Sequence, residues 1–170
     1  MIVAQVIGGT LADHMETLSA HTAVFCQFSG QFDDDKVKIA MDSALLKIDR
    51  YIESHHLHRE TGTYPTMYVK VFSEETASMS GEVAIDVEPT SDTGSLVDGI
   101  QIGKTPSGKA VKFETSAPYG EPNEFYEDVA AWLVSHRLKP KSEAWEVYVK
   151  QGSTVARQDR LTYIYYLIAP

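Results

Sequence analysis

An internal repeat constrains this chain more than any single motif does. The pentapeptide TMYVK at 66–70 returns as EVYVK at 146–150, and the surrounding segments return in the same order. The other matching blocks are YIESHHL (51–57) with WLVSHRL (132–138), EVAIDVEP (82–89) with YIYYLIAP (163–170), and SAHTAVFCQFSGQF (19–32) with SGKAVKFETSAPY (107–119). Because self-similarity at a nearly constant offset is the signature of a repeated structural unit, the sequence predicts a duplicated module.

Each copy of the repeat has the pattern of a strand, a helix and two further strands. A hairpin is also expected over 99–113, with its turn at Pro106-Ser107-Gly108. The short β-rich runs that predict strands are 22–28, 65–73 and 82–88 in the first copy, and 109–115, 144–150 and 161–168 in the second.

One helix is expected in each copy. The acidic run 33–35 predicts the cap and first turn of a helix that ends near His56. The second helix falls within 120–138, and Pro122 and Asn123 predict its start. The apolar residues expected on the buried sides are Ile39, Leu45, Leu46, Ile48 and Ile52 in the first helix, and Phe125, Val129, Trp132 and Leu133 in the second.

The predicted fold class is α+β, in one domain with pseudo-twofold symmetry. The first module is expected over about 15–89, the polar linker over about 90–96 and the second module over about 97–170. One module alone leaves a sheet edge and a sheet face poorly covered. Two modules side by side form a larger antiparallel sheet, with two long helices flanking a central cleft of the kind that binds ligands.

Charge and cysteine content limit the possible partners. The formal net charge of −9 argues against direct nucleic-acid binding, which needs clustered lysine and arginine, and favours cationic partners. The N-terminal stretch has neither the basic region of a signal peptide nor an apolar run long enough for a membrane span. Cys26 is the single cysteine, which suits a reducing compartment, and a cytoplasmic location is expected. No metal or cofactor is expected, because the HHLH run at 55–58 suits a helix C-terminus and no second ligand cluster has metal spacing.

Several segments together resemble the GyrI-like small-molecule-binding domain, which is also the effector-binding domain of AraC-type and MerR-type multidrug regulators. The resemblance rests on the turns at 30–32 and 117–120, on VAAWL (129–133), on WEVYVK (145–150) and on the closing aromatic strand that ends in proline. It covers about residues 15–170. Regulators of this family carry a helix-turn-helix segment before this domain, so this stand-alone form is not expected to bind DNA directly.

The resemblance implies a ligand groove with aromatic walls and one acidic residue, which Glu146 matches by position. Tyr148 would share its strand face, since side chains at i and i+2 point the same way. Tyr68 corresponds to Tyr148 in the first copy, where Thr66 replaces the acid. The further candidate wall residues are Tyr119, Tyr126, Trp132, Tyr163 and Tyr165. The alternative is that Glu146 lies on a solvated sheet face and Tyr148 covers the core.

Three functions follow from the resemblance. The first is a sensor or sequestration module that binds a hydrophobic, cationic or aromatic small molecule without chemistry. The second is a hydrolase of strained-ring electrophilic natural products, with Glu146 as general base and catalytic residue. The third is a protein-binding inhibitor of the gyrase-inhibitor type, and the natural ligand and any protein partner stay open.

Overall fold

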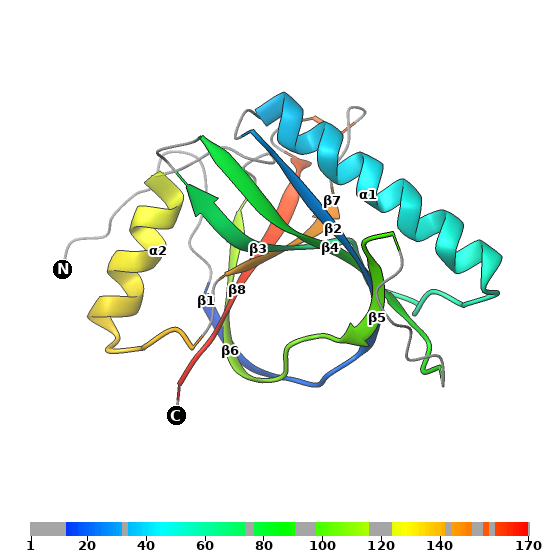
Figure 1. The fold of residues 1–170 in the computed structure, drawn as a ribbon. Helices are drawn as coiled ribbons and strands as arrows, with labels where there is room; N and C mark the ends of the chain where they lie inside the picture. The colour runs from blue at the N-terminus through cyan, green and yellow to red at the C-terminus, as the bar shows by residue number, and fades with distance from the viewer. Residues whose placement is uncertain are drawn as a thin grey trace.

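The chain forms one curved sheet that carries two helices on its outer face (Figure 1). The computed structural model describes residues 13–31, 34–73, 77–90, 98–115, 124–141, 144–150, 155–156 and 159–169. The elements are β1 (Asp13–Leu18), β2 (Thr22–Gln31), α1 (Asp34–Ser54), β3 (Thr66–Ser73), β4 (Ser78–Val87), β5 (Ile100–Lys104), β6 (Gly108–Thr115), α2 (Glu124–Ser135), β7 (Trp145–Lys150) and β8 (Leu161–Leu167). The expected α+β class and antiparallel sheet are therefore confirmed.

The sheet is symmetric in its topology. The strand order is β1-β6-β8-β7-β3-β4-β2-β5, and every neighbouring pair is antiparallel. If β1, β2, β3 and β4 are exchanged with β5, β6, β7 and β8, in that order, the same strand order results when it is read backwards. This is the arrangement that a twofold axis between β3 and β7 requires. The common origin of the two halves and the module boundaries stay predictions, and residues 91–97 of the expected linker lie outside the described residues.

The expected hairpin over 99–113 is wrong, although its strands exist. β5 pairs with β2, whereas β6 pairs with β1 and β8, so the first strand of each half crosses to the other half. The two crossing connections contact each other, because the His21 N–H donates to Thr105 Oγ1 at 2.8 Å and the Thr105 N–H donates to the His21 carbonyl at 3.0 Å. Alternation along a strand reveals that it is a strand but does not name its partner.

The ends of the two helices adopt the same local structure, as the repeat of 51–57 at 132–138 predicts. The first residue of each block stacks on the histidine four positions later, with ring centroids 3.9 Å apart in both cases. His56 and Arg137 follow with φ of 54° and 56°. Leu57 and Leu138 then donate their N–H groups back to the helix at 2.9 and 3.0 Å, which is a C-terminal capping pattern. The histidine at 55 is thus part of a helix end.

The buried side of α1 differs from the expected one. Its buried residues are Val37, Met41, Ala44, Ile48 and Ile52, spaced three or four apart. Ile48 and Ile52 confirm the prediction and Leu45 packs at the margin of the core. Ile39 and Leu46 were assigned wrongly, since they are 67% and 57% exposed. The positions that face the sheet in this part of the helix are those of Val37, Met41 and Ala44. The side chains of 33–35 lie outside the described residues.

The second helix and the strands pack as expected. Phe125, Val129 and Leu133 are buried against β6 and β8, with Trp132 partly buried beside them. Cys26 is fully buried in β2. Gly30 and Gln31 belong to the end of β2, so these two positions of the expected turn are in a strand. Pro122 and Asn123 lie outside the described residues. Neither described helix contains a stretch long and apolar enough to cross a membrane.

A close backbone approach at Gly81 generates a stability prediction. A Cβ at this position of β4 would lie 2.3 Å from the carbonyl oxygen of Tyr68 in β3, next to the irregularity between Val69 and Val71. Gly81→Ala should therefore lower the free energy of unfolding by about 2 to 3 kcal/mol, the cost of overpacking against backbone. Gly30→Ala is the control, because a Cβ there meets nothing within 4 Å. Equal stability of the two variants in urea unfolding would contradict the packing described here.

Candidate functional site

Glu146 lies at the middle of the sheet, on the face that carries the helices. It pairs in register with Met67 of β3 and Ile164 of β8, and both partners belong to the cores under the helices. Figure 1 shows β3 and β7 running between α1 and α2. Trp145 and Val147 point to the opposite face, because side chains alternate along a strand.

Two tyrosines bind the carboxylate of Glu146. Tyr126, from α2, donates its hydroxyl to Oε1 of Glu146, and Tyr148 donates to Oε2 at 2.8 Å. Tyr148 is only 4% exposed and its hydroxyl also lies 3.5 Å from Sδ of Met67. The structure therefore brings together Glu146, Tyr148 and Tyr126 of the candidate site residues. Tyr148 was expected either to share the site with Glu146 or to cover the core, and it does both, because it is buried and also donates to the carboxylate.

The carboxylate is held in an environment that disfavours its charge. Burial raises the pKa of Glu146 above its ordinary value of 4.5, and the hydrogen bonds from Tyr126 and Tyr148 partly oppose that shift. Burial, followed by the negative charge of Glu146, raises the pKa of Tyr126 well above the ordinary range, so this phenol stays a donor. Within the described part of the chain, no lysine or arginine forms an ion pair with Glu146. Among the described residues, the site thus has an acid and two hydrogen-bond donors but no cation.

Three of the candidate tyrosines lie on the opposite, inner face of the sheet. Tyr68 stacks on Trp145 with centroids 6.1 Å apart, and Trp145 stacks on Tyr165 at 5.4 Å. Tyr163 meets Tyr165 edge to face at 6.4 Å, and Lys112 Nζ lies 4.5 Å from the centre of the Tyr163 ring. These rings form a row across the inner face and do not contact Glu146.

The assignment of Tyr68 as the counterpart of Tyr148 is therefore wrong. Tyr148 and Met67 belong to one core cluster on the helix side, whereas Tyr68 packs on the inner face beside Phe25. The pentapeptides align at an offset of 80, but the helix ends align at 81. A shift of one residue along a strand moves a side chain to the other face, which is why the best local match misplaced this tyrosine.

Of the other two aromatic candidates, the structure describes only Trp132. Trp132 stacks on His136 at 3.9 Å and meets Phe113 edge to face at 5.2 Å, so it anchors α2 on the sheet. Tyr119 lies outside the described residues. Met67 is the neighbour of Glu146 that sequence analysis missed, since no local pattern shows that β3 pairs with β7.

Solved structures resemble this fold over nearly the whole chain, although no protein-family model and no curated protein sequence matches. The C-terminal domain of EcmrR is 16% identical, with a TM-score of 0.67 over 94% of this chain and 98% of that one. This chain has the fold of the EcmrR C-terminal domain. In the EcmrR–DNA complex the likeness covers 92% of this chain but 57% of the longer EcmrR chain, at 14% identity and a TM-score of 0.71.

Two further structures share the fold. SAV2435, solved with tetraphenylphosphonium bound, is 14% identical, with a TM-score of 0.57 over 94% of each chain. A hydrolase from Listeria innocua is 9% identical, with a TM-score of 0.61 over 96% of this chain and 94% of that one. Together these structures confirm the fold that the resemblance implied, and they do so at the level of the fold alone.

The raised pKa of Glu146 predicts how stability depends on pH. The native state binds the proton of this carboxyl more tightly than the unfolded chain does, so wild-type stability falls as pH rises from about 4.5 through the native pKa. Glu146→Gln cannot titrate and lacks this loss. Its Tm relative to the wild type should therefore increase with pH across that window and level off above it.

Thermal unfolding from pH 4 to 8 measures this difference. Glu127→Gln is the matched control, since Glu127 is an exposed acid on α2, and its difference from the wild type should stay nearly constant. If the Tm of Glu146→Gln instead falls relative to that of the wild type as pH rises, the hydrogen bonds from the two tyrosines lower the pKa of Glu146 more than burial raises it.

Proposed function

We propose that this chain binds a hydrophobic organic cation at Glu146, in a groove between the two helices. The observation that carries the proposal is a partly buried carboxylate with two tyrosine donors and no cationic partner in the described part of the chain. Burial makes an unpaired carboxylate costly, and an incoming cation relieves that cost. A ligand that brings both the charge and apolar surface suits this position better than a hydrated metal ion or a neutral compound.

The surroundings of Glu146 favour aromatic or alkyl-rich cations. The rings of Tyr126 and Tyr148 lie beside the carboxylate through their hydroxyl hydrogen bonds, and Phe125 lies against Tyr126 with centroids 6.2 Å apart. A desolvated ring face attracts a cation by about 0.5 to 2 kcal/mol. Rigid rings also lose little freedom when a ligand binds, so such walls accept several flat or propeller-shaped compounds. The likeness to SAV2435, which was solved with tetraphenylphosphonium, supports this ligand class through the shared fold.

The role proposed for the domain is that of a sensor or a sequestering protein. EcmrR was solved in complex with DNA, but the present chain matches just over half of that chain. DNA binding is therefore not proposed for the region described here. Ligand binding would instead change how the domain interacts with a partner protein, or it would simply lower the concentration of free ligand.

Tetraphenylphosphonium is the probe for the first test. Glu146→Gln should weaken its binding by about 1 to 3 kcal/mol, because the change removes the counter-charge but almost no volume. Isothermal titration calorimetry at neutral pH measures the effect. The salt dependence of the wild-type affinity should be small, since a buried charge pair is little screened.

Matched controls separate the site from general charge effects. Glu127→Gln removes one negative charge from the exposed surface of α2 and should leave the affinity within a factor of two. A neutral ligand of similar size, tetraphenylmethane solubilised in dilute detergent, should bind wild-type protein no better than the Gln variant. Equal affinity of Glu146→Gln and the wild type for the phosphonium would exclude this site.

The second candidate function is hydrolysis of a strained-ring electrophile. The observation that favours it is the raised pKa of Glu146, which brings the carboxylate closer to the range of a general base near neutral pH. Incubation of the protein with an aryl epoxide, followed by mass spectrometry, distinguishes the two functions. A diol formed by the wild type and not by Glu146→Gln would establish the enzyme, and intact epoxide in both would leave the binding role.

A further inference from the structure

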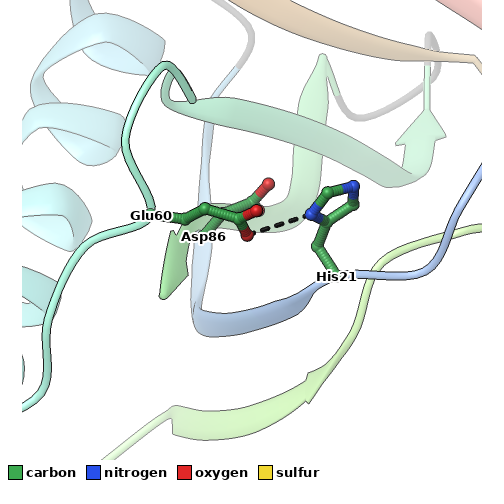
Figure 2. A group of neighbouring side chains, drawn as sticks. All are labelled: His21, Glu60 and Asp86. Carbon is green, nitrogen blue, oxygen red and sulfur yellow. Dashed lines mark hydrogen bonds and ion pairs between the residues drawn. The ribbon is translucent and has the colours of Figure 1, made fainter. Parts of the chain in front are cut away.

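A second group of chemistry-bearing side chains lies away from Glu146. His21 precedes β2, Glu60 follows α1, and Asp86 is near the end of β4. Figure 2 shows the three side chains pointing toward one another from separate segments. One ligand-type atom of each lies within 4.8 Å of the others, and all three residues are partly buried. Asp86 faces the inner side of the sheet, because Ile85 and Val87 belong to the helix-side core.

The backbone around this group holds the three residues in place. The Glu60 N–H donates to the Asp86 carbonyl at 3.0 Å, and the Glu88 N–H donates to the His58 carbonyl at 2.8 Å, so the segment after α1 runs beside the end of β4. His21 is tied to Thr105 by the two hydrogen bonds described above. The positions are therefore set by main-chain contacts and do not depend on the side chains attracting one another.

The charges of the group do not balance. Nδ1 of His21 lies 2.9 Å from Oε2 of Glu60, which accounts for one carboxylate. Asp86 contributes a second carboxylate, and in the described part of the chain neither acid pairs with a lysine or arginine. The arrangement thus has two acids and one imidazole facing a common point.

We propose that His21, Glu60 and Asp86 form a binding site for a divalent transition-metal ion, with Zn²⁺ as the preferred ion and Co²⁺ and Mn²⁺ as weaker ones. One imidazole nitrogen and two carboxylate oxygens are ligands that suit Zn²⁺, Co²⁺ and Mn²⁺. Ligand atoms about 2.1 Å from one ion lie roughly 3 to 4 Å from each other, so small side-chain rotations close the observed spacing. Three protein ligands leave further positions for water.

The position of the site suggests what the ion does. It would join the β1–β2 connection, the segment after α1 and the end of β4, three parts of the chain that are distant in sequence. The site is on the opposite side of β4 from the helix-side core and shares no residue with the Glu146 site. The ion would therefore brace the fold without taking part in ligand binding at Glu146.

The test uses the full chain freed of metal by chelation. Zn²⁺ titrated by calorimetry should bind with a one-to-one stoichiometry, and Co²⁺ should give visible d–d absorption that Zn²⁺ abolishes by displacement. His21→Ala, Glu60→Gln and Asp86→Asn should each lower the Zn²⁺ affinity at least about tenfold, as loss of a group that holds a metal does. Zn²⁺ should raise the Tm of the wild type and not of these variants.

Matched controls identify the residues responsible. His58→Ala and Asp42→Asn remove an exposed histidine and an exposed acid outside the group, and both should bind Zn²⁺ like the wild type. The two carboxamide variants keep the side-chain volume, so they carry the test if His21→Ala fails to fold. Absence of saturable Zn²⁺ and Co²⁺ binding in the wild type, or unchanged binding in Asp86→Asn and Glu60→Gln, would overturn the proposal and leave an ion pair beside an acid.

Discussion

The antiparallel pairing of β3 with β7 connects the two halves of the sheet, and the rest of the structure depends on it. It is short, with Thr66 opposite Val147, Met67 opposite Glu146 and Tyr68 opposite Trp145. Each strand becomes irregular just beyond it. The register of these three pairs decides which side chains face the helices. A slip of one residue would turn the carboxylate toward the inner face and away from its partner on α2.

This register separates two kinds of chemistry on the two faces of one sheet. The helix face has a carboxylate enclosed by apolar residues and two phenol donors, which suits an organic cation. The inner face has a row of stacked rings, and the imidazole and carboxylates of the group around Asp86 lie at its margin. The lysine above Tyr163 already supplies a cation to the end of that row. Among the described residues the acid at the centre of the helix face has no cationic partner, which is why the proposed cationic ligand is assigned to that face.

The carboxylate at 146 is costly to the fold, and this cost is linked to its proposed use. Its tyrosine partners soften the penalty of burial but provide no positive charge. If Glu146 were already paired with an internal cation, a cationic ligand would bind weakly, because it would have to displace that cation. Two neutral donors hold the acid in place while leaving its charge available to a ligand.

The sequence by itself determined where the helices and most strands lie, because hydrophobic periodicity and capping are local properties. The helix ends at 51–57 and 132–138 have the same capped structure that their likeness predicted. The resemblance to GyrI-like domains pointed to Glu146, and alternation along one strand then placed Tyr148 on the same face. Only the tertiary structure decided that β5 crosses to β2, that Tyr68 faces away from Glu146, and that positions 21, 60 and 86 meet. Strand partners, register and contacts between distant segments depend on packing across the whole sheet, and no short stretch of residues contains that information.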